Sequence, residues 1–69
     1  MNNIGENNIG EKIKWLREQK LLTREEFADI LLVNPSTIRK WEKGKMTPRE
    51  SNIIKICRFF KIDKNFFND

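Results

Sequence analysis

A chain of 69 residues, 38% of them apolar and 10% aromatic, suits one small folded domain and argues against disorder. No apolar stretch is long enough to span a membrane, and the first residues lack the apolar core of a signal peptide, so we expect a cytoplasmic location. Cys57 is the only cysteine and there is no histidine. A disulfide within the chain is therefore impossible, and neither a metal site nor a cofactor is expected.

The net charge of +4 is concentrated in one short segment, residues 35–49. This segment holds five bases and the single acid Glu42, whereas bases and acids balance in the rest of the chain. Localised positive charge suits a polyanionic partner such as DNA, although a solvated basic surface would give the same pattern. Charge alone leaves both interpretations open.

The first residues contain a perfect pentapeptide repeat, Asn2–Glu6 followed by Asn7–Glu11. Two copies are too few for a repeat fold, and Asn and Gly favour flexibility, so we predict a flexible N-terminal arm over residues 1–8 and one domain over residues 9–69. No base precedes Lys12, which favours disorder over a DNA contact for the arm. Apolar residues at helical spacing predict a first helix from about Gly10 to Lys20.

Start signals place the next two helices close together. Thr23 and Glu26 have the spacing of a capping box, so the second helix is expected to begin at Thr23. The third is expected to run from about Pro35 to Lys43, with Asn34 as its N-cap and proline at its first position. Only residues 32–33 lie between the second helix and the Asn34 cap of the third, so the two helices are predicted to cross tightly.

A fourth helix is predicted from about Glu50 to Phe60, and a short fifth helix from Asp63 to Phe67. No segment alternates as a strand does, so the expected fold is all-α with five helices. Cys57 falls on the apolar face of the fourth helix, where an inert buried thiol is usual. With no histidine, metal-ligand cluster or glycine-rich phosphate loop, the sequence does not predict an enzyme.

Helical phase separates the two faces of the third helix. With Ile38 pointing inward, Trp41 and Glu42 fall toward the core, and the opposite face holds Ser36, Lys40 and Lys43, flanked by Thr37 and Arg39. Small residues let the start of a helix enter the major groove, and bases can donate to guanine edges or phosphates. We therefore predict that this face contacts DNA.

Each of the first three predicted helices contains a recognisable sequence motif. The motifs are Ile9 to Arg17 (IGEKIKWLR), Leu22 to Ala28 (LTREEFA), and Ile38 to Gly44 (IRKWEKG) followed by Pro48. With these motifs at nearly gapless spacing, the chain from Ile9 to Phe67 resembles the phage-repressor and Cro type of helix-turn-helix protein, the XRE family. The resemblance implies a compact five-helix, lambda-repressor-like domain that binds DNA.

The resemblance also assigns roles to residues. Ser36 and Lys40 would face base edges, and the remaining DNA contacts would come from Arg24, Asn34, Pro35, Thr37, Arg39, Lys43 and Lys45. Arg17 and Glu42 match a pair that forms a salt bridge between helices one and three in relatives, so a structural role is implied for them.

Several positions depart from the family pattern. Leu21 and Leu32 stand where glycine is common, and a left-handed leucine is costly, so the turn at Leu32 is expected to be wider or strained. Arg24 replaces the usual glutamine, which favours a phosphate contact over a base contact. Trp15 and Ile30 occupy positions that are usually polar; local packing is the favoured explanation, and a partner surface is the alternative.

The predicted function is that of a sequence-specific regulator of transcription that binds double-stranded DNA, a repressor acting as a homodimer on a palindromic operator. A second copy is expected because one small module reads few base pairs. Phe59 and Phe67 are left over from the family's core positions and are predicted to form the dimer interface. The alternative is a protein-binding adaptor or antitoxin-like module on the same scaffold, for which the extra apolar residues would provide the surface.

Overall fold

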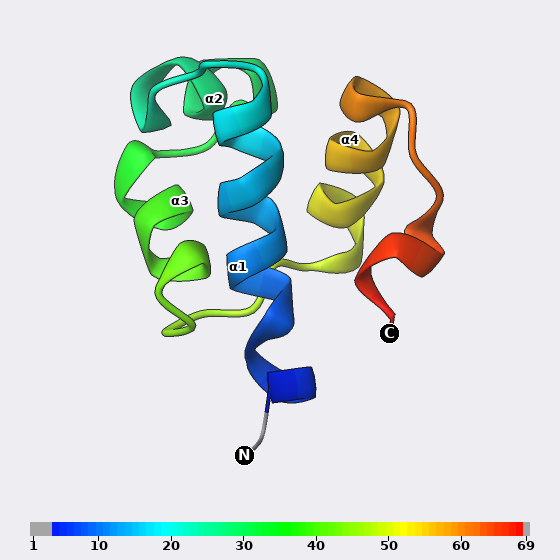
Figure 1. Ribbon diagram of the computed structural model, residues 1–69. Coiled ribbons are helices and arrows are strands. Elements are labelled where there is room, and N and C mark those ends of the chain that lie inside the picture. The colour runs from blue at the N-terminus through cyan, green and yellow to red at the C-terminus, as the bar shows by residue number, and fades with distance from the viewer. Residues whose placement is uncertain (1–3, 69) are drawn as a thin grey trace.

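The computed structural model describes the backbone of residues 4–68 and the side chains of residues 9–68 (Figure 1). Its elements, in chain order, are α1 (Ile4–Gln19), α2 (Arg24–Leu31), α3 (Pro35–Glu42), α4 (Glu50–Phe60) and the 3-10 helix η1 (Lys64–Phe67). The described part of the chain has no strand, and the all-α fold class is confirmed.

The fifth element corrects the prediction of five full helices, because η1 is a single 3-10 turn of four residues. Its backbone hydrogen bonds join each amide to the carbonyl three residues earlier. Phe66 donates to the carbonyl of Asp63, and Asn68 to that of Asn65, both at 3.0 Å. The Asp63 carboxylate also accepts from the Asn65 amide at 2.8 Å. So short a segment cannot establish the repeated bonds across four residues that an α-helix needs.

The first helix begins earlier than the expected start near Gly10. It runs from Ile4, so most of the segment predicted to be a flexible arm has helical backbone. Asn and Gly are weak helix formers, but neither forbids the conformation when a strong helix comes next in the chain. Residues 1–3 of the predicted arm lie outside the described part of the chain.

The capping box that starts α2 is confirmed. The Thr23 hydroxyl accepts from the Glu26 amide at 3.0 Å, and the Glu26 carboxylate accepts from the Thr23 amide at 2.8 Å. At α3, Pro35 occupies the first turn, but the Asn34 side chain makes no capping hydrogen bond. The Asn34 carbonyl instead accepts from the Thr37 amide at 2.9 Å, which leaves the exposed Asn34 side chain uncommitted within the described residues.

The turn between α2 and α3 is strained rather than widened. Leu32 has φ 60° and ψ 46°, the left-handed conformation, and the residue is 83% exposed. Leu21, after α1, adopts the same conformation with φ 58°. A left-handed conformation costs a non-glycine residue roughly 1–2 kcal/mol. The chain tolerates it because the turn also satisfies the end of α2, where the Leu32 and Val33 amides donate to the carbonyls of Asp29 and Ala28.

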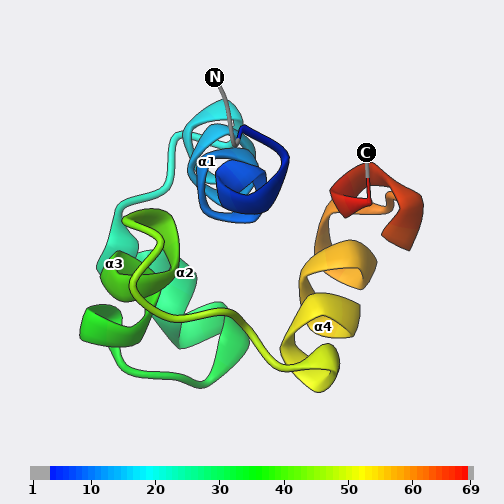
Figure 2. The ribbon, with the colours of Figure 1, turned by 90° about the horizontal axis from the view of Figure 1, so that it is seen from below.

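The core lies between α1 and the two groups of elements on either side of it. Figures 1 and 2 show α2 and α3 on one side of α1, and α4 and η1 on the other. Buried apolar side chains from all five elements fill the space between them: Ile13, Leu16, Phe27, Ala28, Leu31, Ile38, Trp41, Ile56, Cys57 and Phe67. The inward positions predicted for α3 are therefore confirmed.

At Gly10, α1 lies very close to the end of α3. A Cβ atom at this position would lie 2.2 Å from the Trp41 carbonyl oxygen and 3.0 Å from that of Glu42. Real Cβ atoms do not approach backbone oxygens this closely, so only glycine lets the end of α3 rest against α1. This contact fixes where the outer face of α3 points.

Candidate nucleic-acid interface

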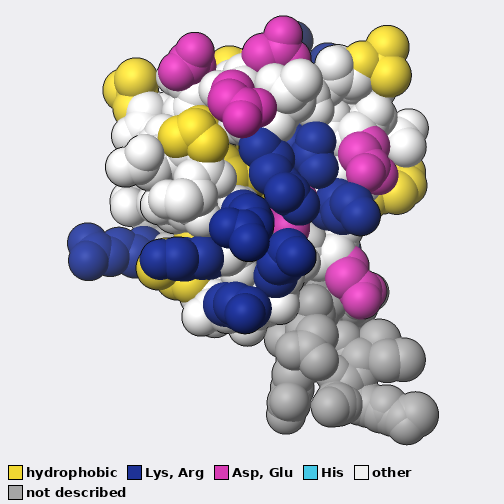
Figure 3. All heavy atoms as spheres, turned by 90° about the vertical axis from the view of Figure 1, so that its left-hand side faces the viewer, with side chains coloured by type: hydrophobic (Ala, Val, Ile, Leu, Met, Phe, Trp, Pro, Cys, Tyr) yellow, Lys and Arg dark blue, Asp and Glu magenta, His cyan; other side chains and the backbone are white. Residues whose placement is uncertain are grey.

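The outer face of α3 is basic and exposed. Lys and Arg side chains gather over α2 and α3 in Figure 3, and most of the acidic side chains on this side of the molecule lie around the margin. Ser36, Arg39, Lys40 and Lys43 are exposed, and Thr37 is half-exposed. Arg39, Lys40, Lys43 and Lys45 line one hollow of about 200 Å³. We refer to this hollow and the exposed face of α3 as the basic face.

Lys45 joins the basic face because the chain folds back after α3. The helix ends at Glu42, Gly44 takes a left-handed conformation with φ 75°, and the Lys45 amide donates to the Lys40 carbonyl at 2.8 Å. Arg49, although part of the same basic sequence segment, is not among the residues that line the hollow and stands at the N-cap of α4. The structure thus brings together only part of the positive charge that the sequence concentrates.

Glu42, the acid of this segment, is withdrawn from the surface. Its side chain is 1% exposed and lies between α1 and α3. The Arg17 guanidinium donates from Nε to Oε2 at 2.6 Å and from Nη2 to Oε1 at 3.1 Å. The hydrogen bond to Glu42 is the main cause of a raised pKa for Arg17, which therefore stays charged although it is buried.

Arg17 also ties α1 to the start of α2, since its Nη1 atom donates to the Leu22 carbonyl at 2.8 Å. A buried charge is tolerated only when it is paired and its remaining donors are satisfied. The Arg17–Glu42 pair meets both conditions, and it holds α1, α3 and the segment before α2 together. Residues implied by the resemblance as a structural pair thus lie directly beneath the basic face.

Arg24 is bound to Glu42, a contact that was not predicted from the sequence. Its Nε atom donates to Glu42 Oε1 at 3.0 Å, while a third of its side chain remains exposed. Helical phase indicates only that Glu42 points inward. That Arg24, 18 positions earlier in the chain, reaches the same carboxylate depends on how α2 crosses α3.

The prediction that Phe67 is left exposed as a dimer contact is wrong. Phe67 is 8% exposed and part of the core, because η1 folds back against α1 and α4. Phe59 is half-buried against Phe60, with ring centroids 4.9 Å apart. The pair of phenylalanines predicted from the sequence therefore does not form an exposed patch.

Trp15 is partly accounted for by local packing. Its ring stacks on Phe66 of η1 at a centroid distance of 6.3 Å, yet the residue remains 52% exposed. Ile30 on α2 is also exposed. Local packing thus covers only part of the Trp15 side chain.

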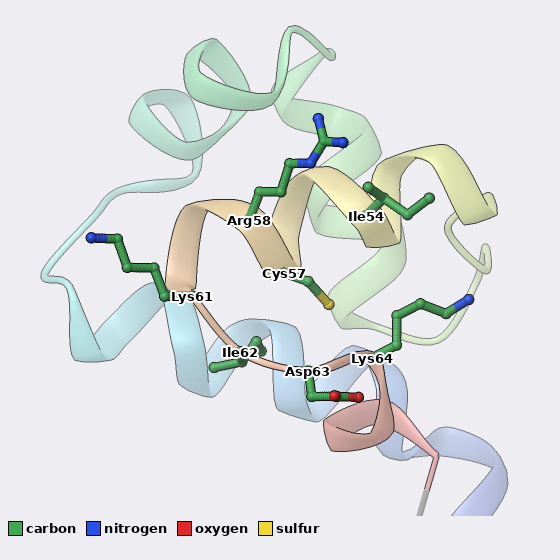
Figure 4. A pocket seen from close by; sticks show the side chains of 7 residues that line it. All are labelled: Ile54, Cys57, Arg58, Lys61, Ile62, Asp63 and Lys64. Carbon is green, nitrogen blue, oxygen red and sulfur yellow. The ribbon is translucent and has the colours of Figure 1, made fainter.

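A second hollow, of about 450 Å³, lies between α4 and the segment leading into η1 (Figure 4). Ile54, Cys57 and Ile62 provide its apolar part, and charged residues of both signs line the rest: Arg58, Lys61, Asp63 and Lys64. Burial, reinforced by Asp63, raises the pKa of the Cys57 thiol. The thiol therefore stays protonated at neutral pH, in agreement with the prediction of a buried cysteine.

Neither a metal centre nor a membrane span emerges from the described residues. Among them, no three His, Cys, Asp or Glu side chains gather as a metal site would require. The same residues include no helix with the length and apolar character needed to cross a bilayer.

Comparisons with known proteins identify the family to which the fold belongs. The HTH_3 helix-turn-helix family matches residues 13–67. The HTH-type transcriptional activator BcrR of Enterococcus faecalis is 40% identical over 54 residues, which make up 78% of this chain and 26% of that protein. The chain thus spans about a quarter of the length of this relative. The family consists of transcription regulators rather than enzymes. Because the match covers most of the chain, the protein belongs to the helix-turn-helix family of the Cro and XRE type.

Proposed function

We propose that this chain binds double-stranded DNA in a sequence-specific manner and regulates transcription by placing α3 in the major groove. The observation that carries the proposal is the basic face: four bases line one hollow, and the nearby acid, Glu42, is buried and paired. A surface built in this way attracts phosphates without an opposing surface charge.

The order of residues along α3 supports base contacts by Ser36 and Lys40. Both are exposed, and Ser36 lies in the first turn, where a small side chain lets the helix end approach the floor of the groove. Lys40 comes one turn later and can donate to guanine. Asn34, Thr37, Arg39, Lys43 and Lys45 flank this line and suit contacts to the backbone, which set the register of the helix.

Two copies acting on a palindromic site remain part of the proposal. One recognition helix distinguishes few base pairs, so two modules on half-sites about 34 Å apart would supply the missing specificity. Bound over a promoter, such a pair would act as a repressor by excluding other proteins. Activation is named for the relative from Enterococcus faecalis, a protein of which this chain matches 26%.

Selection of bound sequences from random duplex DNA tests the proposal. We expect enrichment of a motif with two inverted half-sites, and Lys40→Ala should alter the preferred base at one position in each half. Lys61→Ala is the matched control, because Lys61 is an exposed lysine beside α4 and away from the basic face. Binding without any enriched motif would contradict sequence-specific recognition, and a single unpaired half-site would contradict the paired arrangement.

A protein-binding adaptor is the second candidate function. The exposed Trp15 and Ile30 favour it, since Trp15 remains 52% exposed and Ile30 40% exposed. In this case Trp15→Ser and Ile30→Ser would abolish capture of a partner protein while leaving DNA binding intact. Loss of DNA binding in the same variants would argue against a separate partner surface.

A further inference from the structure

Arg24 is held against the end of α3 by a hydrogen bond. It opens α2, and its Nε atom donates to Glu42 Oε1 at 3.0 Å. Its Nη1 and Nη2 atoms have no hydrogen-bond partner among the described residues, and a third of the side chain is exposed. The guanidinium is therefore bound along one edge and open along the other.

Glu42 shares its two oxygens between two arginines. Oε2 accepts from Arg17, and Oε1 accepts from both Arg17 and Arg24. One carboxylate cannot neutralise two guanidinium groups, so the cluster carries one surplus positive charge. Arg17 is buried and Arg24 is not, so the surplus charge is presented at the surface by Arg24.

We propose that Glu42 is a positioning residue for DNA binding, which holds the Nε edge of Arg24 so that its two Nη atoms form a fork for one DNA phosphate. This inference rests on the proposed function and assigns a further residue to it. A guanidinium presents its donors in a rigid plane, so binding one edge to a carboxylate fixes the direction of the other. Two parallel N–H donors match the two oxygens of a phosphate.

The direction in which one substitution changes the affinity for DNA distinguishes a positioning role of Glu42 from a purely electrostatic one. Glu42→Gln removes a negative charge from beneath the basic face, so electrostatics alone would make DNA bind more tightly. If Glu42 positions Arg24, the same change weakens the hold on the fork, because one of the two acceptor oxygens becomes an NH2 group that cannot accept from an arginine, and DNA binding becomes weaker. Glu11→Gln is the matched control, because Glu11 and Glu42 line the same small hollow but Glu11 is exposed and makes no hydrogen bond to Arg24.

The experiment measures the dissociation constant for a selected operator duplex over a range of salt concentrations, with circular dichroism to verify folding. We expect Glu42→Gln to raise the dissociation constant about tenfold, the loss of one charge-assisted contact, and Glu11→Gln to leave it equal or lower. Arg24→Ala should reduce the salt dependence by about one unit of slope. In the Arg24→Ala background, Glu42→Gln should no longer weaken binding, whereas a merely structural role for Glu42 would weaken it in both backgrounds.

A second measurement does not depend on the folding of any variant. In the nuclear magnetic resonance spectrum of the wild-type protein, the Arg24 Nε–H signal should be protected from exchange with water and should stay so after DNA is added. Loss of this protection on binding, or equal weakening by Glu42→Gln in both backgrounds, would overturn the inference alone. Failure of the wild-type protein to bind any duplex would overturn the proposed function, and the inference with it.

Discussion

The two sides of α1 are both rich in lysine and arginine, yet they use these residues differently. Beside α4 and η1, Lys64 pairs with Glu50 and Lys55 donates to the Leu31 carbonyl at 3.0 Å. On the basic face, Arg39, Lys40, Lys43 and Lys45 form no ion pair within the described residues. Lys55 and Lys64 thus have partners within the chain, whereas the four bases that line the hollow of the basic face remain available together for an external anion.

The largest expected effect is on stability and comes from breaking the buried Arg17–Glu42 pair. Glu42→Ala leaves the Arg17 charge buried without its partner, so the free energy of unfolding should fall by about 3–5 kcal/mol. Glu50→Ala is the matched control, because it removes a pair whose two side chains are both exposed and should change stability little. Urea unfolding measures both, and equal losses would show that the interior placement of the Arg17–Glu42 pair does not matter.

Gly10→Ala should also destabilise the side of the molecule that carries α3. The added methyl group would meet the backbone of Trp41 at 2.2 Å, and overpacking of this kind costs about 1–3 kcal/mol. The control is Gly5→Ala, the equivalent position in the first copy of the repeat and also within α1. There, better helix propensity should maintain or raise the melting temperature. A stable Gly10→Ala variant would contradict the close crossing of α1 and α3.

The comparison predicts that substitution of lysine affects DNA recognition on one side only. Lys40→Ala should reduce discrimination between operator variants by about 1–3 kcal/mol at one base pair, whereas Lys61→Ala should leave the preference profile unchanged. Competition binding with single-base variants of the operator measures this difference. An unchanged profile for Lys40→Ala would place base recognition elsewhere.

The left-handed residues give a smaller effect of the opposite sign. Leu32→Gly should stabilise the protein by about 0.5–1 kcal/mol, because relief of backbone strain exceeds the extra entropy of an unfolded glycine. Lys61→Gly should raise the stability to a similar extent, because Lys61, after α4, also has a positive φ of 59°. Thr47→Gly, at an exposed position without positive φ, should instead lower the melting temperature. A destabilised Leu32→Gly variant would mean that the Leu32 side chain contributes more than its exposure indicates.

The smallest effect concerns pH on the side of α4. Burial raises the pKa of Cys57 above its usual 9.0, so the native state holds this proton more firmly than the unfolded chain does. The resulting stability is present below the unfolded pKa and is lost as the pH rises through the native one. From about pH 8 to about pH 10, the wild-type protein should lose more stability than Cys57→Ala. Parallel pH profiles for the two proteins would show that the thiol does not ionise differently on folding.

Patterns along the chain predicted most of the helices because local signals define them. The capping box of Thr23 and Glu26, Pro35 at the start of α3 and the apolar spacing of α4 each act within one or two turns. The start of α1 and the form of η1 were predicted incorrectly, since weak helix formers and short segments take their conformation from the neighbouring helix or from the elements packed against them.

The sequence by itself determined the all-α architecture, the inward phase of Ile38, Trp41 and Glu42, and the concentration of positive charge around α3. These features depend on periodicity and on residues near one another in the chain. Only the tertiary structure decided that Phe67 is buried, that Lys45 lies beside Lys40, and that Arg24 shares Glu42 with Arg17. Each of these depends on how separate segments cross or fold back, and side-chain contacts across such crossings are fixed by packing rather than by spacing along the chain.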